Sequence, residues 1–437
     1  MTKISLKVYK GILVIFFHIC RKKIKILSGI RDQYSYGLPN DLIERIIPSL
    51  PVKSICKFKC LSKSWKQFLS SLYLARIHYI SPRLPSAPFA LFYTMKGFFC
   101  LRLSDIVNGA KIPLKPIKLL SGDHHKQINV ASHSNGLVCY MPWEFNDALP
   151  LAICNPATHD HIALPRLPQW SRKSKGRILG FYFNPSSVSF TILVTFFLYT
   201  TIGVEHWLFS SSDGYWKKII DGFELFPHPA TYLCIKGRRY RLYNDYQTAR
   251  IRVAIFDLDR GKWVTLALPS EVKASLTTPL YRGDDKDEKF KLVEGGSGDK
   301  ICLVDVSIKE VLRIWNLRLL EGKAGVMVFH WEEKARVDLW KDCEPLLCFP
   351  SRDIIFHQHY ALVVAMDPSL RCIKNKIELL LYDVRRNKLV KRSSMKLNMR
   401  RGFLWVGYNG EDGKDYLAGH IHVFPYRETL LHCHYKE

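Results

Sequence analysis

The feature that most constrains this chain is a unit that recurs between about residue 89 and residue 431. In each copy an apolar, strand-like run ends in a small polar residue, a turn follows, and a hydrophobic residue begins the next strand six or seven positions later. Successive copies lie 55, 47, 48 and 78 residues apart. Three intervals are close to the roughly 50-residue period of propeller blades, and the fourth has room for an extra element. The copies begin at Asn155, Ser210, Asp257, Asp305 and Asp383.

These repeats predict a large, mostly antiparallel β-propeller, because radial repetition leaves few strand edges exposed. Trp216, Trp263 and Trp315 lie in the strands that follow the turns. We interpret these three side chains as packing one blade against the next. A role in stacking on nucleic-acid bases is the alternative interpretation.

A different pattern precedes the repeats, in the stretch LPNDLIERIIPSLPVKSICKFKCLSKSWKQFL at residues 38–69. Its apolar residues recur at helical spacing, which predicts short helices with a break near Cys60 and Leu61. Pro48 is expected to end the first helix early, because a proline inside a helix removes a hydrogen bond and clashes with the carbonyl of Glu44. A unit of this size cannot enclose all its large apolar side chains. They face either the rest of the chain or a partner.

The chain is strongly basic, with 65 Lys and Arg against 39 Asp and Glu and a net charge of +26. Such an excess favours acidic partners, whether nucleic acid, anionic lipid or acidic protein. Residues 11–20, GILVIFFHIC, imitate the apolar part of a secretory signal, but RKKIK follows where a cleavage site should lie. The run is too short to span a bilayer. We expect residues 1–35 to form an extension or a weak interfacial anchor.

The 12 cysteines include no CxxC pair, and several lie in strand-like runs. This pattern predicts reduced core thiols in a protein of the nucleus or the cytoplasm. Neither the His432-Cys433-His434 segment nor Cys343 with Cys348 has the spacing of a zinc site, so we expect no metal and no cofactor.

Motifs of catalysis are missing from the sequence: there is no GxSxG, HExxH or GxxxxGK[ST]. GGSGDK at residues 295–300 is too short for a phosphate loop, and DDKDEK at 284–289 lacks the spacing of a calcium loop. We therefore expect no catalytic residues and a protein that is not an enzyme.

The early segment resembles the F-box of the large plant F-box families, through Leu38-Pro39, DLIE at 41–44, LPVKSI at 50–55 and FKCLSKSW at 58–65. The resemblance implies that an adaptor of the Skp family is the partner that completes the helices, linking them to a cullin and a RING subunit. It places Trp65 in the motif's own core. Carried over by position, it implies these adaptor-facing residues: Leu38, Pro39, Leu42, Ile46, Leu50, Pro51, Val52, Ile55 and Phe58.

The later segments resemble the kelch-like, F-box-associated domain of the same plant proteins. The resemblance rests on SNGLVCY at 134–140, ICNPATHDHIALP at 153–165, GFYFNP at 180–185 and FPYRETLL at 424–431. It implies a small all-α F-box at 36–81 followed by an all-β propeller at 90–431. The paired glycines of kelch blades are absent, so the number of blades and the closure of the ring stay open.

Two functions are compatible with these observations. The first is the substrate receptor of a cullin-RING ubiquitin ligase, in which the propeller holds an unidentified protein target. The second is a basic propeller that binds nucleic acid, suggested by the net charge and by KGRRYRLY at 236–243. Salt dependence distinguishes them, because binding to phosphates weakens steeply with salt.

Overall fold

The computed structural model divides the chain into two compact units, residues 1–84 and 85–437. Among the segments discussed above, residues 1–35, 124 and 125, 284–289, 343 and 348 lie outside the residues that the structure describes. The structure describes residues 46–80, 89–94, 97–102, 106, 128–142, 151–167, 174–198, 203–219, 232–235, 237–245, 250–257, 262–272, 290–295, 300–305, 311–321, 327–338, 352–357, 360–366, 376–396 and 422–434.

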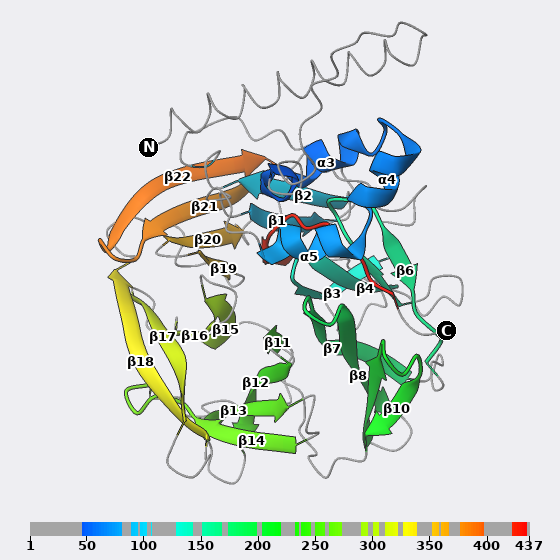
Figure 1. Cartoon of the computed structure of the whole chain (residues 1–437). Helices are drawn as coiled ribbons and strands as arrows, with labels where there is room; N and C mark the ends of the chain where they lie inside the picture. The colour runs from blue at the N-terminus through cyan, green and yellow to red at the C-terminus, as the bar shows by residue number, and fades with distance from the viewer. Residues whose placement is uncertain are drawn as a thin grey trace, which may run out of the picture. The chain divides into compact units, whose positions relative to one another are not determined.

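The first unit is helical, with a short 3-10 turn η1 (Ile47–Ser49) followed by α3 (Val52–Phe58), α4 (Lys63–Leu69) and α5 (Leu72–Ile80) (Figure 1). Ile46 is helical and the 3-10 turn begins at Ile47, so Pro48 lies inside this turn; the rest of the first predicted helix lies outside the described residues. The predicted break near Cys60 separates α3 from α4, and Ser62 begins α4 by accepting a hydrogen bond from the Trp65 amide at 3.1 Å.

Each helix has one buried side, and a hydrogen bond links the beginning of the helical unit to its last helix. His78, which is fully buried, donates a hydrogen bond through Nε2 to the carbonyl oxygen of Leu50 at 3.2 Å. This bond ties α5 to the turn that precedes α3. The buried hydrophobic residues are Ile47, Leu50, Val52, Ile55, Phe58, Leu69, Leu74 and Ala75.

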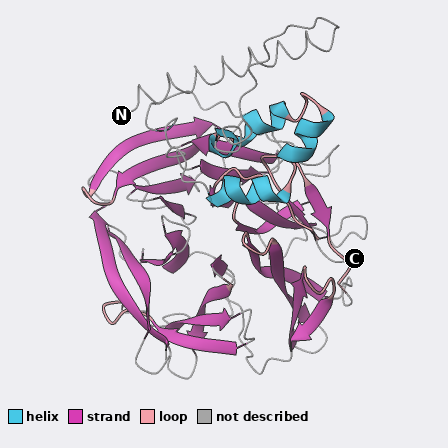
Figure 2. Ribbon diagram, viewed as in Figure 1, coloured by secondary structure: helices cyan, strands magenta, loops and turns pink. Residues whose placement is uncertain are grey.

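The second unit is built from antiparallel sheets (Figure 2). Among the described residues there are five four-stranded sheets, each formed by four consecutive strands, and one three-stranded sheet. The first two four-stranded sheets contain β3 (Ile128–Ser134), β4 (Leu137–Pro142), β5 (Ala152–Cys154) and β6 (His161–Ala163), then β7 (Ser174–Asn184), β8 (Ser189–Leu198), β9 (Gly203–Ser210) and β10 (Trp216–Ile219).

The next three sheets repeat the same order of strands. They contain β11 (Tyr232–Ile235), β12 (Arg238–Asp245), β13 (Arg250–Asp257) and β14 (Lys262–Ala267), then β15 (Phe290–Gly295), β16 (Lys300–Asp305), β17 (Val311–Glu321) and β18 (Met327–Asp338), then β19 (Arg352–His357), β20 (Tyr360–Met366), β21 (Lys376–Asp383) and β22 (Lys388–Lys396).

The three-stranded sheet joins the two ends of the propeller. In it β23 (His422–Tyr426) pairs with β1 (Phe89–Thr94), which pairs with β2 (Gly97–Arg102). The strands β3, β7, β11, β15, β19 and β23 contact one another in this order. The ring closes through a buried cluster of Leu91, Val138, Tyr140, Ala152, Cys154 and Tyr426, which packs the three-stranded sheet on the β3–β6 sheet. The predicted fold class, short helices followed by an all-β propeller, is confirmed.

Four of the five repeat copies mark one place in a blade, the turn between its third and fourth strands. Ser210, Asp257 and Asp383 end β9, β13 and β21, and Asn155 directly follows β5. Asp305 differs because it ends β16, the second strand of its blade. The 48-residue interval before Asp305 therefore holds three strands and the 78-residue interval after it holds five, where the others hold four. The unequal spacing reflects this shift within one blade.

The four sequence segments that resemble the F-box-associated domain meet in space. Ser134 Oγ accepts a hydrogen bond from the Phe183 amide at 3.0 Å, and Asn135 Nδ2 donates to the Phe183 carbonyl at 2.6 Å. Asn155 Nδ2 donates to the carbonyl oxygens of Thr429 and Leu431 at 2.9 and 2.8 Å. These bonds connect two neighbouring blades and the C-terminal segment at the point where the ring closes.

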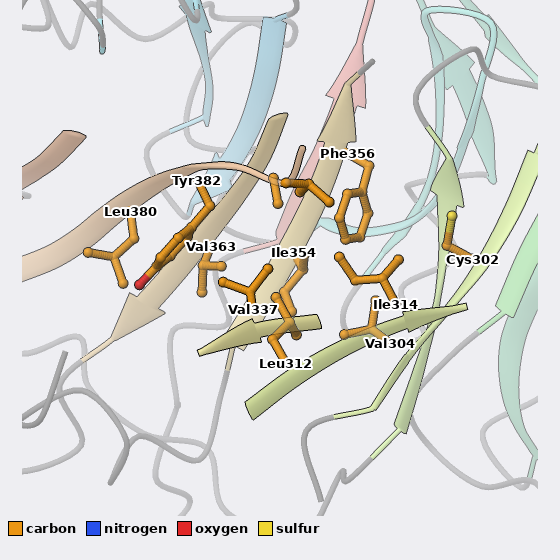
Figure 3. Close-up of a cluster of buried hydrophobic side chains, with 12 residues drawn as sticks. Cys302, Val304, Leu312, Ile314, Val337, Ile354, Phe356, Val363, Leu380 and Tyr382 are labelled. Carbon is orange, nitrogen blue, oxygen red and sulfur yellow. The ribbon is translucent and has the colours of Figure 1, made fainter. Parts of the chain in front are cut away.

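Apolar side chains fill the spaces between neighbouring sheets. Figure 3 shows one such cluster between the β15–β18 and β19–β22 sheets, where Ile314 and Val337 lie near Ile354. Trp216 and Trp315 are 8% and 3% exposed, and Trp216 Nε1 donates to the Pro165 carbonyl after the preceding blade at 2.9 Å. Trp263 is half-buried, with its ring 4.7 Å from that of Phe256. The packing role predicted for these tryptophans is confirmed.

Candidate functional site

The residues expected to face an adaptor differ in their exposure. Leu38, Pro39 and Leu42 lie outside the described residues. Ile46 is half-buried and Pro51 is exposed. The other four are 3%, 1%, 0% and 8% exposed, in the order Leu50, Val52, Ile55 and Phe58. In the unpartnered chain these four side chains are therefore buried, and their contact with an adaptor stays a prediction.

The helical unit exposes a different set of apolar side chains. Tyr73 and Ile80 of α5 are 56% and 72% exposed, and Leu61 and Leu72 are each 36% exposed. Lys53 and Lys57 of α3 are exposed. The sequence did not single out this second set, because an apolar residue pattern does not tell which side chains the folded unit covers. Large apolar side chains that stay exposed in one chain are common where a partner binds.

The described part of the basic stretch, residues 237–243, belongs to the interior of the propeller. Arg239 and Arg241 are 0% and 2% exposed, and the Arg239 guanidinium carbon lies 5.6 Å from the centre of the Trp263 ring. Arg238 forms an ion pair with Asp257 at 3.4 Å. The idea that this stretch offers nucleic acid a basic, aromatic surface is therefore wrong, because its strand β12 lies inside a sheet and buries these side chains between blades.

A buried histidine lies near the two arginines. His206 of β9 is 8% exposed, and burial together with the positive charges of Arg239 and Arg241 lowers its pKa to about 4. Both effects disfavour the charged imidazolium. His206 is therefore neutral at physiological pH and forms part of the packing between neighbouring sheets.

Of the five cysteines in strand-like runs, three lie in the core and two are partly covered. Cys139, Cys154 and Cys302 are buried, and Cys100 and Cys234 are half-buried. Burial raises the pKa of the Cys139 and Cys154 thiols, and that of Cys302 to about 11. Thiols with raised pKa values carry little thiolate and react slowly.

Neither a metal centre nor a membrane-spanning helix is found in the part of the chain that the structure describes. In the C-terminal segment Cys433 is buried, and burial raises the pKa of its thiol. Cys343 and Cys348 lie outside the described residues. The described histidines, cysteines and acidic residues thus give no ligand set for a metal.

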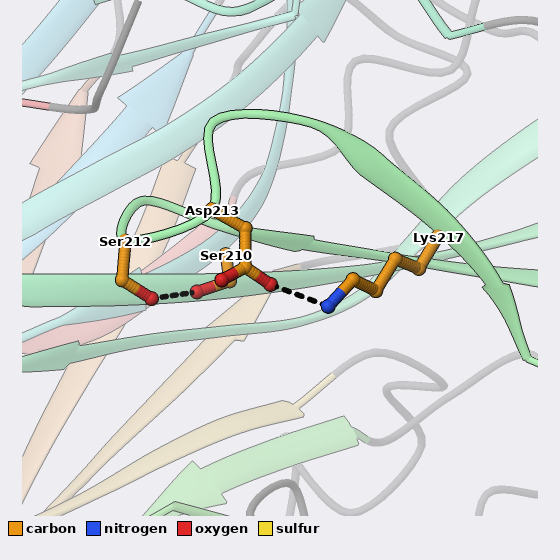
Figure 4. Close-up of polar contacts among 4 residues, drawn as sticks. All are labelled: Ser210, Ser212, Asp213 and Lys217. Atoms are coloured by element: carbon orange, nitrogen blue, oxygen red, sulfur yellow. Dashed lines mark hydrogen bonds and ion pairs between the residues drawn. The ribbon is translucent and has the colours of Figure 1, made fainter.

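The turn between β9 and β10 shows how polar side chains organise one blade (Figure 4). Ser210 and Ser212 share a hydrogen bond of 2.6 Å between their hydroxyl oxygens, and Lys217 forms an ion pair with Asp213 at 2.7 Å. The amide groups of Asp213 and Gly214 donate to the Ser210 carbonyl at 3.1 and 2.9 Å. The neighbouring Lys218 is paired with Glu205 at 2.7 Å. The lysines of this outer strand are thus balanced by nearby carboxylates.

The architecture defines a class of protein: a small helical unit joined to a closed β-propeller. Comparison with known families agrees. Residues 36–76 match the F-box domain, and residues 114–294 match the F-box associated beta propeller domain. The chain thus carries an F-box and an F-box-associated propeller.

Proteins of Arabidopsis thaliana are similar to this chain. One F-box protein is 27% identical over 258 residues, covering 54% of this chain and 62% of the relative. Another is 25% identical over 316 residues, covering 69% of this chain and 73% of the relative. An F-box/kelch-repeat protein is 24% identical over 338 residues, covering 73% of this chain and 74% of the relative. The similarity to the first of these relatives spans less than two thirds of its length.

Solved structures resemble the chain only distantly. TolB from Acinetobacter baumannii has a TM-score of 0.40 and 9% identity, and the match covers 77% of this chain and 70% of TolB. A prolyl oligopeptidase B from Galerina marginata has a TM-score of 0.32 and 11% identity over 61% of this chain and 33% of its own. Both scores are below the level at which such a likeness supports an argument.

Proposed function

We propose that this protein is the substrate-receptor subunit of a cullin-RING ubiquitin ligase. The observation that carries the proposal is the presence of an F-box and an F-box-associated propeller on one chain. In this role the F-box binds a Skp-family adaptor, which links it to the cullin and the RING subunit. The kelch-like propeller recruits a protein target, and the complex works in the nucleus or the cytoplasm.

The receptor acts by proximity and takes part in no covalent step. Holding a target beside the ubiquitin-loaded enzyme replaces a bimolecular encounter by an effectively unimolecular one, which lowers the entropic part of the barrier. The proposed protein needs no cofactor and no active site.

Two surfaces of the F-box contribute to the proposed adaptor contact. The first comprises the nine residues carried over from the resemblance, of which Pro51 is exposed in the unbound chain. The second comprises the exposed apolar side chains Tyr73 and Ile80. A partner can cover exposed side chains without rearranging the helices, so these give the cleaner test.

The test is co-purification of the full chain with a Skp-family adaptor. Tyr73→Asp with Ile80→Asp is expected to weaken the complex by about tenfold or more, since few apolar anchors dominate such interfaces. The helical content of the variant should not change, because both side chains are exposed. Lys53→Ala with Lys57→Ala is the matched control on exposed positions and should mainly slow association.

A second pair tests the buried candidates. Leu50→Asp with Ile55→Asp should also abolish adaptor binding, but it places two carboxylates at positions that are 3% and 0% exposed. Each carries a desolvation penalty of several kcal/mol, so the helical unit itself is expected to unfold. The melting temperature of the propeller should stay as in the wild-type protein. An unmodified chain that fails to bind any Skp-family adaptor would refute the proposal.

A further inference from the structure

The outer strand of the β19–β22 sheet and the turn before it carry an unusual concentration of positive charge. Residues 383–392, DVRRNKLVKR, contain five Lys or Arg and one Asp, a net charge of +4. We call these residues the basic hairpin. Arg385, Arg386 and Lys388 are exposed, and Lys391 is half-buried. In Figure 1 the basic hairpin lies at the edge of its sheet, where β22 has β21 as its neighbour.

The turn of the basic hairpin is held in one conformation. Asp383 is 6% exposed, and its Oδ1 accepts hydrogen bonds from the amides of Arg385 and Arg386 at 3.0 and 3.2 Å. Asn387 adopts a left-handed conformation with φ of 48°, which asparagine tolerates better than most residues. A rigid turn displays its cationic side chains with little loss of backbone entropy when a ligand binds.

Folding does not require this charge. The equivalent turns at Asn155 and Ser210 form with the same kind of backbone and side-chain hydrogen bonds, yet residues 155–162 and 210–216 contain no Lys or Arg. The β10 strand does carry Lys217 and Lys218, but each is paired with a carboxylate at 2.7 Å. In the basic hairpin Arg386 lies 3.7 Å from Asp383, and within the described residues Arg385 and Lys388 have no ion pair.

The chemistry of the basic hairpin fits an acidic peptide better than other anionic partners. Val390 is 43% exposed between the cationic residues, which offers an apolar contact to a peptide side chain. Residues 383–396 contain no aromatic residue, whereas proteins that bind single-stranded nucleic acid stack bases on aromatic rings. The register shift opposite Leu381 and Tyr382 marks a β-bulge, a device that discourages the addition of another strand. We therefore expect side chains, and not the pairing of an added strand, to recognise the partner.

We infer that the basic hairpin is a docking surface of the propeller for an extended segment rich in Asp and Glu on the protein target. This inference rests on the proposed receptor function, since it names the chemistry of what the propeller recruits. Arginine and lysine side chains hold carboxylates by charge-assisted hydrogen bonds, and the surrounding positive field speeds the encounter.

Fluorescence anisotropy with the full-length protein tests the inference. The probe is a labelled ten-residue peptide of alternating Asp and Glu, and the comparison peptide has Asn and Gln in their place. We expect only the acidic peptide to bind, with an affinity that falls as salt rises. Arg385→Gln with Lys388→Gln should weaken binding about fivefold, since each exposed ion pair contributes about 0.5 kcal/mol.

Lys217→Gln with Lys218→Gln is the matched control, because it removes the same charge from the outer strand of another blade. It should leave peptide binding unchanged. Equal weakening by both variants, or equal binding of the two peptides, would show that only net charge matters and would overturn the inference. Tighter binding of a ten-nucleotide single-stranded DNA, lost in the Arg385 and Lys388 variant, would overturn it in favour of nucleic acid.

The same protein preparations are mixed with the Skp-family adaptor, so the two proposals fail separately. Loss of peptide discrimination with adaptor binding intact refutes the docking surface alone. Absence of adaptor binding with peptide discrimination intact refutes the receptor function and leaves an acidic-peptide surface. Unchanged melting temperatures of both variants show that altered binding does not come from altered folding.

Discussion

At the scale of single residues, the closure of the ring depends on positions where side-chain size or polarity is fixed by near neighbours. Gly136 has φ of +84° and completes the β3–β4 turn with Asn135, whose φ is 52°. A Cβ at position 136 would collide with the carbonyl oxygen of Arg427 and lie 2.8 Å from Thr429 Cγ2. The glycine is therefore needed both for the turn and for the approach of the C-terminal segment.

Gly136→Ala is expected to lower the stability of the propeller. The substitution adds the strain of a left-handed conformation and forces the C-terminal segment to move, which together should cost about 2 to 4 kcal/mol. Chemical denaturation followed by tryptophan fluorescence measures the change. A loss below about 0.5 kcal/mol, the range of neutral surface substitutions, would contradict the role given to this glycine.

The buried His206 makes stability depend on pH. Its folded pKa of about 4 lies below the ordinary value of 6.5, so between these values the unfolded chain binds more protons than the folded one. Stability is therefore retained above pH 6.5 and lost as the pH falls towards 4. His206→Gln should flatten the dependence of the melting temperature on pH in this window. An unaltered slope would show that other groups control the acid response.

At the scale of elements, the β5–β6 turn acts on two parts of the chain. Asn155 Oδ1 accepts a hydrogen bond from the Ala157 amide at 2.9 Å within the turn, while Nδ2 holds the carbonyl groups of Thr429 and Leu431. Asn155 is 1% exposed, so water cannot readily replace these bonds. One amide side chain thus shapes a turn and fastens the segment that follows β23.

Asn155→Ala should destabilise the propeller by about 2 to 4 kcal/mol, because it leaves buried carbonyl groups without their donor. Thermal unfolding with and without the substitution gives the value. Thr158→Ala serves as the control, since it removes only an exposed 3.4 Å hydrogen bond in the same turn. If both variants lose the same stability, the turn rather than the tie to the C-terminal segment explains the effect.

At the scale of the whole molecule, β23 makes the sheets a ring. It pairs with β1 from Phe89↔Tyr426 to Tyr93↔His422 and contacts β19 of the preceding blade. Without it β1 would be an open edge beside the apolar cluster that includes Leu91. Such an edge invites pairing with other chains.

Removal of residues 422–437 is expected to abolish the cooperative unfolding transition of the propeller and to promote aggregation. Calorimetry and light scattering measure the two effects. Addition of a synthetic peptide of residues 422–434 should restore part of the transition by supplying the missing strand. A truncated chain that unfolds with the midpoint and cooperativity of the full chain would show that closure contributes little to stability.

Local features of the sequence were sufficient for the helices, the strands and most turns. Proline fixes φ and removes a donor, so Pro48 indicated a departure from the α-helix, and a 3-10 turn is found at Ile47–Ser49. Asn155 and Asp383 indicated turns because their side chains bond to nearby amides. The packing role of Trp216 also followed from its position after a turn. Each of these effects depends on residues within a few positions along the chain.

The tertiary structure alone decided which of the side chains in these patterns are buried. The sequence offered Leu50 and Ile55 as partner-facing residues and did not single out Tyr73 and Ile80, yet the first two are buried and the last two exposed. KGRRYRLY reads as a basic surface, but β12 lies inside a sheet and buries Arg239 and Arg241. Closure joins Phe89 to Tyr426, and no local signal encodes a contact across such a distance. Burial and strand partners are properties of the assembled fold, because they depend on which distant surfaces meet.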